Sequence, residues 1–320
     1  MNRLVAGIAV LGALLALPLP AAADPAGPTS YETTITEVEP PTDAISVRML
    51  GGDAFVELTV SPGTEVVVVG YRGEPYLRFA PDGTVSRNLR SESTYLNEDR
   101  YADAEIPPEA DNDAEPLWEE VGTGGRYAWH DHRTHWMNTD PPPSAEPGDT
   151  ILEATVPLTV DGESVVVAVR SIYVAPPGPW AASLGAVVGL VAAAAAVRIG
   201  PGGVRSTLIA LGVAAATVGI WERLSLPAEA AASALVFLLP GGAIAFAAIA
   251  RPAVAAVATG ASAVQLVAWA VLRWPVLTEP ILPTNAPWAL DRFVTALVLT
   301  GAIGCLVWAI RSLVRPAPAT

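Results

Sequence analysis

Residues 151–197 read ILEATVPLTVDGESVVVAVRSIYVAPPGPWAASLGAVVGLVAAAAAV, and two kinds of sequence pattern meet within them. Ile151–Val160 and Ser164–Val174 are rich in β-branched residues and flank Asp161-Gly162, which predicts a β-hairpin. After a short proline-rich link the chain is continuously apolar over Pro179–Val197, close to the roughly 20 residues of a membrane-spanning helix. The stretch therefore predicts a β-domain that ends where a helical membrane domain begins.

Five apolar stretches of near-spanning length lie in residues 178–315, and we expect each of them to cross the membrane. One set of connections between them carries only arginine, whereas the other set mixes acidic and basic residues. The positive-inside rule places the arginine-only side in the cytoplasm. These arginines are Arg198, Arg205, Arg251, Arg311 and Arg315. The expected spans are Pro179–Val197, Val204–Trp221, Ala230–Ala250, Pro252–Leu272 and Phe293–Ile310.

The first residues of the chain predict export independently. Arg3, the apolar run Leu4–Leu17 and the small residues that end at Ala23 are typical of a secretory signal peptide over residues 1–23. An uncleaved anchor is the alternative. Both signals place residues 24–177 outside the cell, and the expected short tail at 316–320 in the cytoplasm. The sequence therefore predicts a multi-pass protein of the cell membrane, whose first partner is the lipid bilayer.

The charges divide the chain in the same way. Residues 24–177 hold 28 Asp/Glu and 9 Arg, a net charge of −19, whereas residues 178–320 have a net charge of +4. Such an acidic domain argues against nucleic acid as a partner, because phosphates need a basic surface. The chain contains no lysine, and its only cysteine, Cys305, lies in an apolar stretch. The exported domain therefore has no disulfide and depends on its core.

The exported domain contains several segments that alternate in polarity or are β-branched, separated by turn residues. They predict an antiparallel, immunoglobulin-like β-sandwich. Between the early and late segments, residues 89–149 are acidic, proline-rich and poor in aliphatic residues, yet contain six Trp or Tyr. We expect a long, ordered, loop-rich insertion whose aromatic residues pack onto one end of the sandwich. The expected strands are Ala44–Met49, Ala54–Val60, Glu65–Gly70, Tyr76–Phe79, Thr84–Ser86, Ile151–Val160 and Ser164–Val174.

All three histidines of the chain lie within Trp129-His130-Asp131-His132-Arg133-Thr134-His135-Trp136-Met137. Histidine titrates near neutral pH and is the commonest metal ligand, so its confinement to one segment indicates a site. If this segment is a strand, His130 and His132 project to the same side. His135 joins them only if the chain turns after Arg133, and the proline-rich sequence that follows favours such a turn.

Three interpretations of this segment stay open. In the first, the imidazoles bind copper or zinc, the metals expected of an exported site without thiols. In the second, Asp131 pairs with Arg133, the imidazoles bond to backbone carbonyls, and the segment is a structural corner. In the third, it senses protons or contacts a partner. The candidate metal ligands are His130, His132 and His135, with Asp131 and Met137 as candidate further ligands.

No serine or cysteine nucleophile motif and no phosphate-binding loop is present, which indicates a non-enzymatic protein. The leading hypothesis is a membrane-anchored extracytoplasmic binding protein. The alternative is a cell-envelope assembly protein that contacts another envelope protein through the insertion. A weaker alternative is a transporter with a capturing ectodomain, because Gln265 lies deep in one span and Pro240 interrupts another.

Three stretches together resemble a group of multi-span membrane proteins of high-GC Gram-positive bacteria. They are Gly70–Arg78, Asn97–Tyr101 and the histidine segment Trp129–Met137. The resemblance covers most of the chain and implies a signal peptide, an exported domain that ends in strands, and several C-terminal spans. It implies no activity, cofactor or partner.

Overall fold

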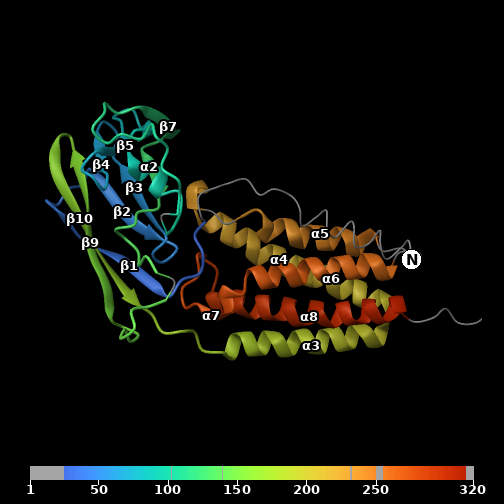
Figure 1. Cartoon of the computed structure of the whole chain (residues 1–320). Coiled ribbons are helices and arrows are strands. Elements are labelled where there is room, and N and C mark those ends of the chain that lie inside the picture. The colour runs from blue at the N-terminus through green and yellow to red at the C-terminus, as the bar shows by residue number, and fades with distance from the viewer. Residues whose placement is uncertain (1–24, 102, 139, 231–232, 250–254, 315–320) are drawn as a thin grey trace, which may run out of the picture.

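The computed structural model describes residues 25–101, 103–138, 140–230, 233–249 and 255–314. The expected signal peptide at 1–23 and the tail at 316–320 lie outside these ranges, as do Arg251 and Arg315. Within them, two antiparallel sheets are followed by a bundle of helices (Figure 1). The two-part organisation expected from the sequence is present.

The β-domain, residues 29–174, contains a seven-stranded and a three-stranded sheet. The predicted hairpin is confirmed, with Val160 paired to Glu163 and positive φ at both Asp161 and Gly162. In spatial order the large sheet comprises β1 (Tyr31–Glu39), β10 (Glu163–Tyr173), β9 (Thr150–Val160), β4 (Val66–Val69), β5 (Pro75–Phe79), β6 (Val85–Asn88) and β7 (Trp118–Gly122). The small sheet comprises β2 (Ile45–Leu50), β3 (Phe55–Val60) and β8 (Arg126–Trp129).

The two sheets share one apolar core. Leu58 of the small sheet and Val66 and Phe79 of the large sheet are fully buried in it, and Trp129 at the end of β8 is almost so. Because successive strand residues face opposite sides, each sheet turns alternate apolar residues inward, as in a sandwich.

The segment 89–149, expected as an ordered, loop-rich insertion, also contains regular elements. This segment forms the short helix α2 (Glu92–Leu96) and then β7 and β8, which extend one edge of each sheet. The apolar pattern missed them because both are short edge strands. β7 exposes Glu119 and Glu120, and only Ala128 and Trp129 of β8 are buried. β1, a polar edge strand, was not predicted for the same reason.

Among the described residues, the bundle contains four helices long and apolar enough to cross a membrane. These are α3 (Trp180–Ile199), α4 (Pro201–Ser225), α6 (Ala255–Leu272) and α8 (Trp288–Val314). Of the third expected span, Ala230–Ala250, the described residues form the end of η1 (Ala228–Ala230) and α5 (Leu235–Ile249). The 15 described residues of α5 are about 22 Å long, compared with roughly 30 Å for a bilayer core. The short α7 (Pro275–Thr278) precedes α8.

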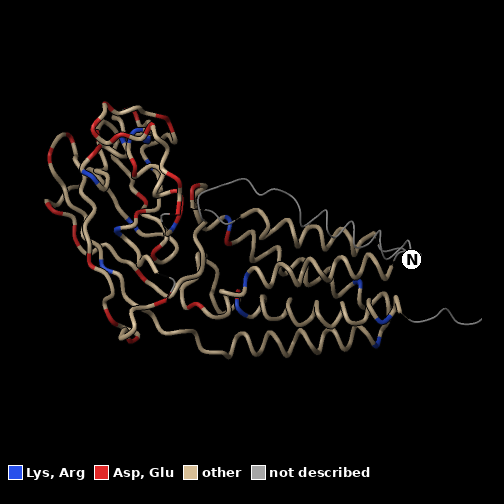
Figure 2. The backbone as a smooth tube through the Cα atoms, in the orientation of Figure 1, with Lys and Arg blue, Asp and Glu red and all other residues tan. Residues whose placement is uncertain are grey.

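Consecutive helices of the bundle run in alternating directions. Arg205 near the start of α4 donates to the carbonyl of Ala248 near the end of α5, at 2.7 Å. At the end of the bundle far from the β-domain, the coloured charges are all basic, whereas both signs occur at the end nearest it (Figure 2). The described arginines of the all-arginine set are far from the β-domain, whereas Trp180, Trp221, Trp274 and Trp288 are exposed at the helix ends nearest it.

Small residues bring α3 and α8 together side by side. Gly185 and Gly189, one turn apart on α3, have no room for a side chain: a Cβ would overlap the Phe293 carbonyl at the first and the Leu297 carbonyl at the second. This is the small-xxx-small packing of membrane helices.

The β-domain contacts the bundle through the chain at its start. Ala26 N–H donates to the Ala230 carbonyl at 3.1 Å, and Thr29 forms an isolated bridge with Ile281. Ala230 of η1 is also part of an apolar cluster with Phe55 of β3. The small sheet therefore rests against the loops at one end of the bundle (Figure 1).

Candidate functional site

The histidine loop, residues 130–138, begins where β8 ends at Trp129. Asp131–Thr134 form a turn, because the backbone N–H and the hydroxyl of Thr134 both donate to the Asp131 carbonyl, at 2.9 and 2.8 Å. The strand alternation expected for His130 and His132 therefore does not apply. The sequence predicts a turn after Arg133, which would bring His135 to the other two imidazoles. The turn in the structure starts two residues earlier, at Asp131.

An ion pair inside the loop fixes the turn. Arg133 binds Asp131 with two parallel bonds of 2.7 Å, from Nε to Oδ1 and from Nη2 to Oδ2. The indole N–H of Trp129 donates to Oδ2 at 3.1 Å, and Arg133 Nη1 donates to the Val69 carbonyl at 2.9 Å. The guanidinium also lies 5.0 Å from the centre of the Tyr71 ring. Asp131 thus makes the pair that the structural interpretation requires, and its two carboxylate oxygens are both in use.

The pair also sets the ionisation of Asp131. Burial by itself would raise the pKa of this carboxyl, but the hydrogen bonds and charge of Arg133 outweigh burial and hold the pKa below its ordinary 3.8. Asp131 is therefore charged wherever the domain is folded at neutral pH. Its negative charge is balanced within the loop by Arg133.

The three imidazoles gather around His135. The centroid of the His135 ring lies 5.5 Å from that of His132 and 6.3 Å from that of His130, with edge-to-face geometry in both pairs. The outer two rings rest on aromatic neighbours. His130 packs on Phe55 at 4.0 Å and His132 stacks on Tyr71 at 5.8 Å. His130 and His135 are almost fully buried.

Hydrogen bonds assign the protons on two of the rings. His132 Nε2 lies 2.9 Å from the Asp99 carbonyl, and His135 Nδ1 lies 3.1 Å from the Trp136 carbonyl. A carbonyl only accepts, so these nitrogens carry the hydrogens. In the neutral form of each ring, the unshared electron pair is then on the other nitrogen, Nδ1 of His132 and Nε2 of His135. His135 Nε2 is buried and has no hydrogen-bond partner among the described residues.

The surroundings keep His135 neutral. Burial lowers the pKa of this imidazole to about 3, and the positive charge of Arg100 acts in the same direction. A neutral ring whose Nδ1–H is fixed by a carbonyl and whose Nε2 is unprotonated is the usual state of a metal-binding histidine.

Metal geometry can be compared with these positions. With Zn–N bonds of 2.0–2.1 Å, two imidazoles on one tetrahedral ion have ring centroids roughly 5 Å apart. The separation between His132 and His135 is close to this value, whereas His130 is farther away. No group of three or more His, Cys, Asp or Glu side chains within the described ranges is already arranged to hold a metal. A three-histidine site therefore requires a local shift of His130.

Sequence reasoning did not find a second polar cluster, at the end of the bundle nearest the β-domain. Arg273 pairs with Glu222 at the end of α4 and binds both oxygens of Asp291 on α8 at 2.8 Å. Its guanidinium lies 5.1 Å from the Trp269 ring. In the sequence, these charged residues served only to orient the membrane spans. Their spatial proximity, which the sequence does not contain, makes them a buried network that joins three helices.

The features that suggested transport are packed in the bundle. Pro240, which has no N–H, leaves the Val236 carbonyl without its helical donor, and the Trp269 indole N–H fills that position at 2.9 Å. The side chain of Gln265 lies against Gly242 of α5, in the space that a Cβ atom would fill if residue 242 were not glycine. Both are consistent with a kink that neighbouring helices stabilise.

No family model, curated protein or solved structure matches the chain. The resemblance to membrane proteins of high-GC Gram-positive bacteria therefore stays a prediction.

Proposed function

We propose that the chain is a membrane-anchored extracytoplasmic metal-binding module, in which His130, His132 and His135 take up copper or zinc. The observation that carries the proposal is the buried, unpartnered Nε2 of His135, with its lone pair left free by the Nδ1–H bond to Trp136. An unsatisfied buried nitrogen costs about 1–3 kcal/mol, which a metal ligand bond would remove. Asp131 is not a ligand in this proposal, because both its oxygens are bound.

Met137, directly after the loop tryptophan, is half-buried and is kept as a candidate fourth ligand. A thioether would favour copper over zinc, since soft ligands select Cu(I). The imidazoles alone suit either metal.

Competitive titration of the full-length protein with Zn²⁺ and, under reducing conditions, with Cu⁺ tests the proposal. We expect one equivalent to bind. His135→Gln should weaken that binding by at least about 10–100-fold, since even loss of an outer-shell partner has this effect. Trp136→Phe is the matched control, because it alters the same loop but keeps the three imidazoles and the Trp136 carbonyl. Absence of binding in the wild type, or equal binding in His135→Gln, would contradict the proposal.

A cell-envelope interaction protein is the second candidate function. The observation in its favour is the Asp131–Arg133 pair, which makes the loop a self-contained structural corner without any metal. In that case His135→Gln would lower thermal stability or partner recovery while added zinc or copper changed neither.

The membrane topology belongs to the same proposal. We propose five spans, with α5 as the third, an extracytoplasmic immunoglobulin-like β-domain and a cytoplasmic C-terminus. The alternating directions of the helices and the arginines at the far end support an odd number of crossings. Reporter fusions after residue 175 and after residue 314 should report opposite sides of the membrane; the same side for both would exclude five spans.

A further inference from the structure

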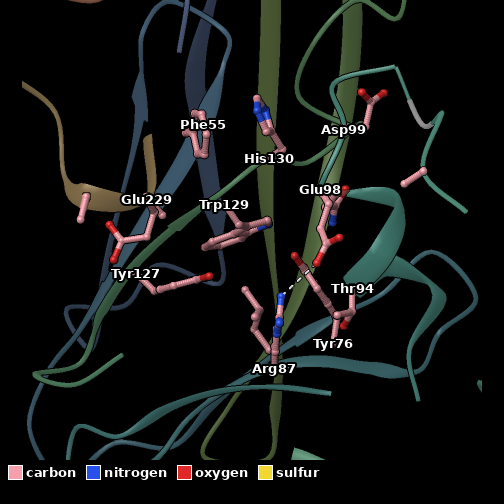
Figure 3. Close-up of a pocket in the computed structure, with 15 residues that line it drawn as sticks. Phe55, Tyr76, Arg87, Thr94, Glu98, Asp99, Tyr127, Trp129, His130 and Glu229 are labelled. Carbon is pink, nitrogen blue, oxygen red and sulfur yellow. Dashed lines mark hydrogen bonds and ion pairs between the residues drawn. The ribbon is translucent and has the colours of Figure 1, made fainter. Parts of the chain in front are cut away.

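A cleft of about 610 Å³ opens between the β-domain and η1, beside the end of the bundle (Figure 3). Its walls come from β3, β5, β6, β8, the segment that follows α2, and η1. His130 reaches one wall, but most of the cleft lies outside the histidine loop. Sites for small molecules usually enclose roughly 300–1,000 Å³ and often lie between domains, so its size and position are those of a ligand site.

The charges that line the cleft are predominantly negative. Arg87 contributes a guanidinium, but its Nε lies 2.6 Å from Glu119 and its Nη1 3.2 Å from Glu98, so its charge is already balanced. Asp99 and Glu229 also line the cleft, and neither makes an ion pair within the described part of the chain. A ligand that enters therefore meets a net negative potential, which favours a cation.

Aromatic side chains lie beside these carboxylates. Tyr127 and Trp129 are two residues apart on β8 and so share one face of the strand. Tyr127 is half-buried, and its hydroxyl makes no hydrogen bond within the described residues. Burial raises the pKa of Tyr127; Arg87 lowers it, and Glu229 raises it further. In the view of Figure 3, Glu229 lies on one side of Tyr127 and Arg87 on the other.

We propose that this cleft binds the ammonium group of a small organic cation, with Glu229 as its counter-charge and the Tyr127 ring as its aromatic contact. A carboxylate next to an aromatic face is the combination that recognises ammonium groups, because the face of the ring is electronegative. The cleft adjoins the ends of the spans, so the ammonium can come from a dissolved amine or from a phospholipid headgroup.

Binding of ethanolamine to the full-length protein tests this proposal, measured by calorimetry in nanodiscs of phosphatidylglycerol, which has no amine. We expect saturable binding of ethanolamine and none of ethylene glycol, its uncharged counterpart. Glu229→Gln should weaken binding about tenfold or more, because it removes a charge-assisted contact. Tyr127→Leu should also weaken it. Glu163→Gln, an exposed carboxylate at the start of β10, is the matched control and should leave binding unchanged.

The lipid arm separates the two sources. If nanodiscs of phosphatidylethanolamine suppress ethanolamine binding, the headgroup occupies the cleft; if they do not, a dissolved amine does, and both results support an ammonium site. The absence of saturable binding in phosphatidylglycerol, equal binding of ethylene glycol, or full binding in both Glu229→Gln and Tyr127→Leu would overturn the proposal.

Discussion

Replacing Asp131 by Asn is the sharpest test of how the histidine loop is held together. The change keeps the shape of the side chain but removes the charge that accepts both bonds from Arg133. Arg133 would then keep its bond to the Val69 carbonyl and its contact with Tyr71, neither of which carries a negative charge. An uncompensated, largely buried guanidinium costs about 3–5 kcal/mol.

This loss of stability corresponds to a large fall in the midpoint of thermal unfolding. For a domain of this size each kcal/mol lowers the midpoint by roughly 2–4 °C, so Asp131→Asn should lower the β-domain transition by about 6–20 °C. Near-UV circular dichroism of the full-length protein follows this transition, because Trp129, which donates to Asp131, is buried in the sheet core.

The matched control is Glu153→Gln. Glu153 also pairs with an arginine, Arg170 on the neighbouring strand, but both side chains are more than half exposed. Surface pairs contribute at most about 1 kcal/mol, so this variant should lower the midpoint by only a few degrees. If Asp131→Asn is no more damaging than Glu153→Gln, the loop is not held by its ion pair and the reasoning fails.

Three other predictions concern pH and the bundle. Because the folded pKa of Asp131 lies below 3.8, its contribution to stability is fully present above that pH and is lost as the pH falls through the folded pKa. In urea unfolding, Asp131→Asn should therefore lower the free energy of unfolding at pH 7 and lower it less below pH 3.8. An equal loss at both pH values would contradict this. Gly189→Val should destabilise the bundle by about 1–3 kcal/mol in detergent melts, since its side chain meets the α8 backbone, whereas Ala194→Val on the exposed face of α3 should be nearly neutral; equal effects would show that α3 and α8 do not pack there. Trp269→Phe should cost about 1–3 kcal/mol by leaving the Val236 carbonyl unpaired, and an unchanged melt would mean that this carbonyl finds another donor.

The sequence predicted the parts of the fold that carry strong periodicity. The β9–β10 hairpin followed from two β-branched runs around Asp161-Gly162, and α3 followed from an apolar run of spanning length. The edge strands β1, β7 and β8 were missed because their polar, one-sided composition resembles that of loops. Edge strands gain their stability from pairing with a neighbour, which no local window contains.

The candidate site divides in a similar way. The sequence allowed both the Asp131–Arg133 pair and bonds from imidazole to carbonyl, and both are present. What it did not contain is the position of Phe55, at the start of β3, and of Tyr71, in the turn between β4 and β5. These two rings lie against His130 and His132. The buried network around Arg273 was missed for the same reason, since its partners are 51 and 18 residues away.

Metal content of the full-length protein tests the central claim most directly. After expression in medium that contains zinc and copper, and purification without chelators, elemental analysis should find close to one equivalent of copper or zinc per chain. A variant with His130, His132 and His135 all replaced by Ala should contain none. A wild-type protein without metal, or a triple variant with as much metal as the wild type, would contradict the proposal that this loop is a metal site.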